Sequence, residues 1–479
     1  MNKSIIRYLL CRVIQFEGIF LLLPVIVAFI YGEYSGIYFA IVSAASLILG
    51  SIGTIKKPKS NVFYAREGFV TVSLSWLLLS LISAIPFTIS GEIPSYLDAV
   101  FETASGFTTT GATILSDVEA MSMSSMFFRC FTNWIGGMGV LVFMMAILPL
   151  SGNSNMYLMK AESTGADVSK LVPKVKDSAK ILYGMYLGLT GVLIVIYLIL
   201  GEPVYDAFIL AFSTMGTGGF GRYNASLGAY GYATQTVTII FMFLCGINFN
   251  AFFLLLRRKA KEFFKLEEVW WYFGIMVFMV AGVTTQVYDK YSSLREAVHH
   301  SAFQVVSIMT TTGFSTADFE LWSDFAKAVL LLAMFIGGCA GATAGGIKVS
   351  RLLILMRSVK KEIGHLTHPR SIRRIKLNGS AVSDETIKNI ESFLIAYVLI
   401  FIISLVIVFA DNYDFTTSFS SVLSMMGNVG PGLNKVGPTG NFSIFSPLSK
   451  IVLIFDMLAG RLELFPMLVL LYPATWRKS

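Results

Sequence analysis

The chain has 479 residues, of which 55% are hydrophobic and only 14% are charged, and its mean hydropathy is +0.70. A soluble protein could not cover so many apolar residues with polar surface, so the composition predicts an all-α polytopic membrane protein. The net charge of +8 comes from basic clusters in alternate connections between apolar segments, which indicates cytoplasmic loops and argues against nucleic-acid binding. These clusters are Lys56 to Lys59, Lys170 to Lys180, Arg257 to Lys265 and Lys348 to Lys376.

The first apolar run, at about 13–31, follows a basic start that contains Lys3, Arg7 and Arg12. Glu17 interrupts the run and no small-residue cleavage site follows it, so we expect a retained helix rather than a signal peptide. A second helix is expected at about 37–52. Residues 1–55 are therefore predicted to form a two-helix extension that begins in the cytoplasm.

The rest of the chain repeats one pattern four times, in residues 56–160, 161–265, 266–376 and 377–479. Each unit is expected to hold a spanning helix, a half-helix too short to cross a bilayer of about 30 Å, a glycine-containing loop and a second spanning helix. The first spanning helices are expected at 68–87, 179–200, 270–287 and 390–409, and the half-helices at 95–107, 204–215, 294–309 and 414–426. The second spanning helices are expected at 123–148, 236–256, 325–355 and 450–471. With the extension this predicts ten spanning helices, and both termini on the cytoplasmic side.

The glycine-containing loops keep one register in all four units. Each loop ends at a glycine, and a serine stands six residues before it; the glycines are Gly111, Gly219, Gly313 and Gly430, and the serines Ser105, Ser213, Ser307 and Ser424. A single such glycine could belong to a turn or to a helix-packing site. Four in register predict four pore loops around one pseudo-fourfold axis.

The residue types in these loops suit the dehydration of a cation. A potassium ion gives up its water only where oxygens replace it, and rings of backbone carbonyls do this in potassium channels. Carbonyls that turn toward a shared axis need backbone angles open mainly to glycine. The candidate filter residues are Thr109, Thr110 and Gly111, then Thr217, Gly218 and Gly219, then Thr311, Thr312 and Gly313, and finally Asn428, Val429 and Gly430.

Acidic residues stand at the outer ends of the half-helices. Such groups at a cation entrance raise the local ion concentration, although each one can equally be a solvated loop residue. They are Asp98, Glu102, Asp206, Glu296 and Asp414.

Two segments beneath the loops depart from plain helix. The ten residues 337–346 contain five glycines, Gly337, Gly338, Gly341, Gly345 and Gly346. They predict an unwound segment below the filter, while a GxxxG packing face remains the alternative. Arg461 stands inside the last apolar segment, where a charge is costly and usually functional. The alternative is a structural ion pair between Arg461 and a neighbouring acid.

On these residues the sequence resembles the Trk/Ktr/HKT superfamily of potassium transporters. The resemblance rests on Thr-Thr-Thr-Gly at 108–111 and 310–313, on the small-residue stretch 337–348, and on Gly-Arg-Leu-Glu-Leu-Phe at 460–465. The N-terminal helix pair is similar to the TrkH/TrkG branch. Pro431, directly after the fourth glycine, departs from the family pattern.

The resemblance implies a potassium uptake channel of the bacterial inner membrane, with K⁺ as the transported ion and no cofactor in this chain. It also implies a homodimer that works with a cytoplasmic TrkA-like nucleotide-binding subunit. The stretch from Gly337 to Lys348 would be an intramembrane gate loop, and Arg461 a positive barrier beside it.

A H⁺- or Na⁺-coupled secondary transporter is the main alternative. Such proteins usually couple through intramembrane acids or histidines, and here these are few: Glu17, Asp456, Glu463 and the pair His299 and His300. An enzyme is not expected, because no nucleophile–base pair or metal cluster is evident. The four cysteines lack CxxC spacing, so we expect reduced thiols.

Overall fold

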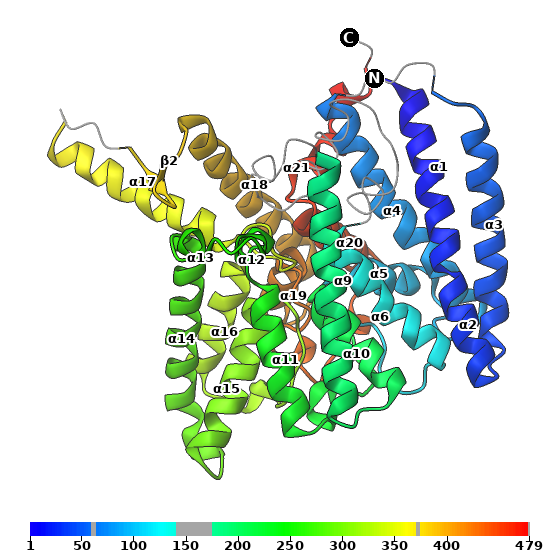
Figure 1. Cartoon of the computed structure of the whole chain (residues 1–479), viewed down its shortest axis with the longest axis horizontal. Coiled ribbons are helices and arrows are strands. Elements are labelled where there is room, and N and C mark those ends of the chain that lie inside the picture. Colours follow the sequence, from blue (N-terminus) through cyan, green and yellow to red (C-terminus); the bar gives the residue numbers. More distant parts are fainter. Residues whose placement is uncertain (59–63, 140–174, 370–373, 478–479) are drawn as a thin grey trace.

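The computed structural model describes residues 1–58, 64–139, 175–369 and 374–477, which form a bundle of helices (Figure 1). Within these residues, six helices are long and apolar enough to cross a membrane, or seven if one sharply bent pair is counted as a span. The prediction of a multi-pass all-α membrane protein is confirmed. Of the ten spanning helices expected, the second helices of units two, three and four are interrupted in the structure.

The N-terminal extension is the predicted helix pair. Its first span bends at Leu21, and Gly32, with φ of 69°, ends it. The turn that follows attaches the pair to the first unit, since the Glu33 carboxylate accepts hydrogen bonds from the backbone N–H groups of Met123 (2.7 Å) and Ser124 (3.0 Å). The helices are α1 (Lys3–Phe20), α2 (Leu22–Tyr31) and α3 (Ser35–Ile55).

The first spanning helix of every unit lies within a few residues of its predicted position. These helices are α4 (Ala65–Ile89), α9 (Val175–Ile199), α14 (Glu267–Val287) and α18 (Asp384–Val408). Long apolar sequences make them the clearest spans in the chain.

The half-helices also match their predictions. They are α5 (Tyr96–Phe107), α10 (Val204–Gly216), α15 (Leu294–Met309) and α19 (Phe415–Gly427). Three of them begin at a side chain that accepts a hydrogen bond from the first turn, namely Ser95, Ser293 and Asp414. At 1.5 Å per residue none of the four is long enough to cross a bilayer.

The second helix is interrupted in units two, three and four. The two pieces in unit two bend by 92° at a short break around Gly246, which the sequence did not predict. The pieces are α11 (Tyr232–Cys245) with α12 (Phe249–Leu256), α16 (Asp324–Ile336) with α17 (Val349–Thr367), and α20 (Pro447–Arg461) with α21 (Phe465–Leu471).

In unit one, α6 (Met123–Met138) ends at Gly139, whose φ is 82°. The predicted continuation to Leu148 lies outside the described residues. So do the predicted boundary between units one and two at residue 160, and the basic residues 170–174.

A small hairpin follows α17 and was not predicted. Strands β1 (Lys376–Leu377) and β2 (Ser380–Ala381) pair antiparallel across Asn378 and Gly379, whose φ values are 52° and 76°. Asn-Gly suits this tight turn because both residues tolerate positive φ. The Asn378 side chain also accepts a hydrogen bond from the backbone N–H of Glu267 (2.8 Å), at the start of α14. One short helix, α13 (Ala260–Phe263), lies between α12 and α14.

The hydrophobic core forms two main clusters. One joins the N-terminal helices to units one and four through residues such as Trp76, Phe101 and Leu453. The other joins units two and three, for example through Tyr272 and Phe303. All four cysteines have free thiols. The two clusters also overlap in the units that they join, since the first includes Phe212 of unit two and the second includes Val429 of unit four.

Candidate functional site

The four loops share one backbone conformation. Each follows directly on a half-helix, and two residues in each have positive φ. The final glycines have φ of 76° (Gly111), 70° (Gly219), 81° (Gly313) and 104° (Gly430). Two residues earlier, φ is 55° at Thr109, 52° at Thr217, 56° at Thr311 and 54° at Asn428. The sequence analysis expected such angles mainly at glycine, yet threonine and asparagine also adopt them here. This costs about 1–3 kcal/mol for each residue, which favourable contacts around the loops must offset.

The repeated serine marks where each loop is tied to its own half-helix. The backbone carbonyl of Ser105 accepts a hydrogen bond from Thr110 N–H (2.9 Å), five residues later. The same bond occurs in the other units, from Gly218 to Ser213 (2.9 Å), from Thr312 to Ser307 (2.8 Å) and from Val429 to Ser424 (2.9 Å). Because the bond is local, each unit determines its own loop geometry.

The loops close into a ring in chain order. A side chain on any final glycine would overlap a carbonyl oxygen of a neighbouring loop. Gly111 faces the carbonyl of Gly218, Gly219 that of Thr312, Gly313 that of Val429, and Gly430 that of Thr110. The fourth loop thus returns to the first, and the Asn428 amide strengthens this closure by donating to the Thr110 hydroxyl (3.0 Å).

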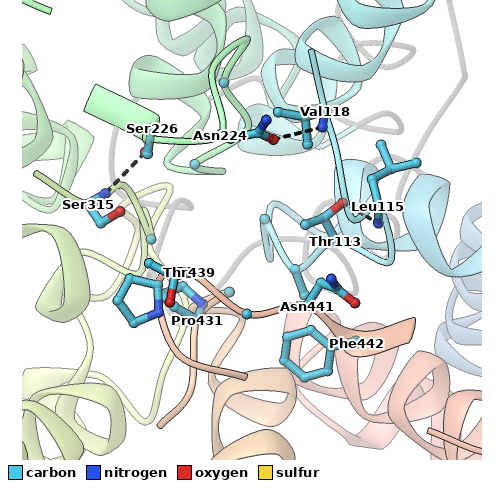
Figure 2. A pocket seen from close by; sticks show the side chains of 18 of the residues that line it. Thr113, Leu115, Val118, Asn224, Ser226, Ser315, Pro431, Thr439, Asn441 and Phe442 are labelled. Atoms are coloured by element: carbon cyan, nitrogen blue, oxygen red, sulfur yellow. Dashed lines mark hydrogen bonds between the residues drawn. The ribbon is translucent and has the colours of Figure 1, made fainter. Parts of the chain in front are cut away.

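A cavity opens on one side of this ring (Figure 2). All four final glycines line it, and Thr113, Asn224, Ser315 and Asn441 add polar groups around its wall. Pro431, the departure from the family pattern, also faces this cavity (Figure 2). The candidate site is therefore an opening next to the ring of loops. The four final glycines form its floor, and polar side chains contribute to its wall.

The five acids that were considered as entrance residues have different surroundings in the structure. None of the five acids is among the residues that line the cavity. Glu102 and Asp206 are buried and paired with Arg129 and Arg222. The other three take structural roles at half-helix starts, where Asp98 pairs with Lys450, Glu296 accepts from Ser292 N–H, and Asp414 caps α19. Burial alone would raise the pKa of Asp414, but the hydrogen bonds that its carboxylate accepts from Thr417 lower the pKa overall.

The glycine-rich stretch of unit three is unwound, as predicted, and the alternative of a GxxxG packing face is wrong. Helix α16 ends at Ile336, and α17 begins only at Val349. Gly337, Gly341 and Gly346 have φ of 72°, 74° and 77°. We call residues 337–348 the intramembrane segment.

Contacts from three units hold the intramembrane segment directly under the ring. Gly345 N–H donates to the Thr311 hydroxyl (2.7 Å), and a side chain on Gly345 would overlap the carbonyl of Gly427. On another side, the segment exchanges backbone hydrogen bonds with the break in unit two. Cys339 N–H donates to Gly246 (2.9 Å), and Phe249 N–H donates to Gly341 (3.1 Å). The other predicted members, Gly338 and Lys348, lie in the same segment, and the buried Lys348 amine donates to the Ala344 carbonyl.

Arg461, at the end of α20, is 6% exposed and reaches across to other units. Its guanidinium donates to the Thr343 carbonyl (2.6 Å) in the intramembrane segment and to the Gly136 and Gly137 carbonyls at the end of α6. Glu463 instead pairs with Arg351. Arg461 therefore brings a positive charge beside the intramembrane segment and below the ring.

The family assignment follows from the sequence comparisons. The family model described as TrkH, cation transport protein, matches residues 36–269 and 263–477. The chain belongs to the TrkH family of cation transport proteins. It is 36% identical to the Trk system potassium uptake protein TrkH of Salmonella typhimurium over 99% of each chain. It is also 32% identical to the TrkG protein of Escherichia coli over 100% of each chain.

The fold comparison agrees with this assignment. A crystal structure of the potassium transporter TrkH from Vibrio parahaemolyticus matches with a TM-score of 0.88 and 32% identity, and the match covers 100% of each chain.

Two buried charges of this TrkH-family chain were not predicted from sequence. Glu268, on α14, accepts hydrogen bonds from the backbone N–H groups of Ala340 (2.7 Å) and Ser350 (3.1 Å), so it ties the intramembrane segment to the start of α17. Arg129, on α6, pairs with Glu102 at 2.5 Å. The sequence did contain a signal for both residues, because each is a charged residue inside or directly beside an apolar segment. Such a residue usually has a partner or a function.

Proposed function

We propose that this chain forms a potassium-selective uptake pore, in which carbonyls of Thr109–Gly111, Thr217–Gly219, Thr311–Gly313 and Asn428–Gly430 replace the water of K⁺. The closed ring of four loops with the same pair of positive-φ residues carries this proposal. Non-helical backbone at membrane depth is tolerated where it lines a cavity, and carbonyl rings select K⁺ in channels. The relatives' name, potassium uptake protein, supports K⁺ as the ion.

The intramembrane segment, with Arg461, is proposed as the gate beneath this filter. Its backbone crosses under the ring, and the guanidinium adds a positive charge that repels a cation where little water screens it. Small residues form the segment, so few side chains anchor it by packing. An opening movement would exchange a limited number of hydrogen bonds.

Residues 56–160, 161–265, 266–376 and 377–479 are proposed as four repeats in the bacterial inner membrane, with both termini in the cytoplasm. Basic residues of the α12–α14 connection and of α17 support this orientation. The first and last described residues lie at the same end of the bundle in Figure 1, which is consistent with it.

Two protein partners are proposed. A TrkA-like nucleotide-binding subunit would dock on the basic cytoplasmic connections, as the relatives' designation as a Trk system suggests. A second copy of this chain would pack on α17, which projects from the bundle (Figure 1). An exposed apolar stripe on that helix supports this, and it consists of Met356, Val359, Ile363 and Leu366.

The direct test is ion flux through purified protein in liposomes with no other protein present. We expect K⁺ to move down its own gradient, and to move faster than Na⁺ under matched gradients. Protein-free liposomes supply the background. Absence of K⁺ flux, or equal K⁺ and Na⁺ flux, would contradict a potassium-selective pore.

A coupled potassium transporter remains a second candidate because of two buried carboxyl groups. Glu17 on α1 accepts from the Ser83 hydroxyl, and Asp456 on α20 accepts from the Ser404 hydroxyl (2.7 Å). In each the other carboxyl oxygen has no hydrogen-bond partner among the described residues, which suits a group that binds and releases a proton. Potassium uptake driven by a pH gradient, with no K⁺ gradient, would favour this candidate over a pore.

A further inference from the structure

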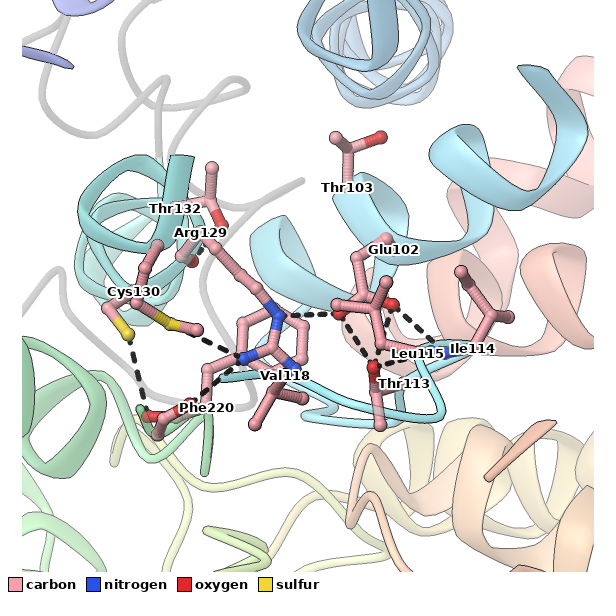
Figure 3. A network of polar contacts seen from close by, with 12 residues as sticks. Glu102, Thr103, Thr113, Ile114, Leu115, Val118, Arg129, Cys130, Thr132 and Phe220 are labelled. Atoms are coloured by element: carbon pink, nitrogen blue, oxygen red, sulfur yellow. Dashed lines mark hydrogen bonds and ion pairs between the residues drawn. The ribbon is translucent and has the colours of Figure 1, made fainter. Parts of the chain in front are cut away.

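A buried polar network joins the outgoing ends of the first two loops (Figure 3), and two of its members, Thr113 and Arg129, also line the cavity. Its centre is Glu102 on α5, which is 1% exposed. One carboxylate oxygen accepts from Arg129 Nε (2.5 Å) and from the Thr113 hydroxyl (3.0 Å), and the other accepts from Ile114 N–H (3.0 Å). Thr113 and Ile114 follow Gly111, so Glu102 holds the outgoing end of the first loop.

Arg129 extends the same network to the second loop. Its Nη1 donates to the Gly221 carbonyl (3.3 Å), two residues after Gly219, and its guanidinium lies 3.5 Å from the centre of the Phe220 ring. Arg129 and Glu102 therefore connect the outgoing ends of two neighbouring loops through a single ion pair. A shift of either side chain would change the spacing between those loops.

Among the equivalent positions of the four units, only Glu102 of unit one is charged, and only Gln304 of unit three has a comparable contact with the loop. Nine residues before the final glycine, units two, three and four carry Leu210, Gln304 and Ser421. Gln304 has a similar role without charge, since its amide donates to the Ala317 carbonyl (3.1 Å) on the outgoing side of its own loop. A neutral amide thus ties one loop, whereas the ion pair of unit one ties two.

We propose that Glu102 and Arg129 are positioning residues for cation discrimination, which keep the first and second loops at the spacing that rejects Na⁺. This inference rests on the proposed function and deepens it. Neither side chain needs to touch the ion. A buried ion pair suits the role because each charge is compensated only in one geometry, and displacement of either partner leaves an unpaired charge.

The test compares the K⁺/Na⁺ flux ratio of folded, purified variants in liposomes. Glu102→Gln keeps the shape of the side chain but leaves the Arg129 charge uncompensated. We expect its ratio to fall by about tenfold, which corresponds to ~1.4 kcal/mol of lost discrimination. Glu33→Gln is the matched control, because Glu33 also accepts backbone hydrogen bonds from α6 residues but touches no loop. Its ratio should stay at the wild-type value.

The double variant Glu102→Gln, Arg129→Gln separates positioning from mere stability. Removal of both charges should restore the yield of folded protein, because no lone buried charge remains. The flux ratio should stay low, since the tie to Gly221 is lost. A ratio that returns to wild type together with the yield would overturn the inference and leave only a structural role.

Thr113→Val keeps both charges and removes one hydroxyl from Glu102. We expect a fall in the ratio of about threefold, the scale of one hydrogen bond. If Glu102→Gln gives no folded protein, Thr113→Val tests the inference in its place. An unchanged K⁺/Na⁺ flux ratio in Thr113→Val would then overturn the inference. Wild-type protein without K⁺ flux would overturn the proposed function itself. Selective wild-type flux with an unchanged ratio in folded Glu102→Gln would overturn only the role of Glu102 and Arg129.

Discussion

The ring of loops and the intramembrane segment are both non-helical backbone between helices, but they are held in different ways. Each loop is tied to its own half-helix by a short local bond, such as the one from Thr110 to Ser105. The intramembrane segment has local bonds too, such as that from Lys348 N–H to the Ile336 carbonyl, but it also bonds to distant parts of the chain, for example Gly246, Thr311 and Arg461. The conformation of each loop is therefore determined locally, whereas the conformation of the intramembrane segment also depends on how the units meet.

This difference suits two different tasks. A selective site must keep its oxygens at fixed distances. A local bond in every unit fixes the conformation of each loop, and contacts such as those of Asn428 with Thr110 and of Arg129 with Glu102 fix the spacing between loops. A gate must have two arrangements of similar free energy, and contacts across units can be exchanged when those units move. We therefore expect changes in the ring to alter which ion passes, and changes around the intramembrane segment to alter how fast ions pass.

The largest expected effect comes from Gly313→Ser in the ring. A β-carbon there would overlap the Val429 carbonyl, and the φ of 81° is itself costly for serine, by about 1–2 kcal/mol. We expect the K⁺/Na⁺ flux ratio to fall by at least about tenfold, equivalent to ~1.4 kcal/mol. Gly274→Ser, at a helix glycine with nothing within 4 Å, is the control. An unchanged ratio in folded Gly313→Ser would contradict the filter assignment.

Arg461→Ala should give the next largest effect, which is a change in the rate of K⁺ flux. The change removes a positive charge and the hydrogen bonds that reach the Thr343 and Gly136 carbonyls. We expect K⁺ flux per folded protein, without any partner subunit, to rise by about fivefold or more, since even a modest barrier of ~1 kcal/mol accounts for that factor. The K⁺/Na⁺ ratio should change little. Flux at or below wild type would count against Arg461 as a barrier.

Glu268→Gln should also raise the K⁺ flux, but by less than Arg461→Ala. An amide oxygen can still accept from Ala340 and Ser350 N–H groups, but more weakly than a carboxylate. We expect flux to rise by about twofold to threefold with an unchanged ion ratio. Glu267→Gln, which changes the neighbouring pair with Arg357, should leave flux unaltered. A changed ion ratio in Glu268→Gln would show that the two regions are not separable.

Val359→Glu should have the smallest effect on transport. The residue is 61% exposed on α17 and touches neither region, so a charge there should weaken only the packing of a second copy. We expect the protein to become monomeric in detergent, as measured by light scattering, with flux per chain within about twofold of wild type, as for surface substitutions generally. A dimer that persists would place the interface elsewhere.

The sequence alone determined the class of protein, the positions of the first spanning helices and half-helices, and the register of the loops. These features depend on residues close together in the chain. Apolar length determines a span, a serine caps a helix start, and a glycine permits positive φ at its own position. The unwound stretch between Gly337 and Gly346 was predictable for the same reason, because closely spaced glycines destabilise helix locally.

Only the tertiary structure decided which charged residues have partners. Glu102 looked like an entrance acid and is instead buried against Arg129, 27 residues later, while Glu268 meets Ala340, 72 residues later. The break at Gly246 likewise depends on its contact with Cys339 in another unit. A buried charge or a broken helix is tolerated only where distant segments supply its hydrogen bonds, and a single sequence does not show which distant segments those are.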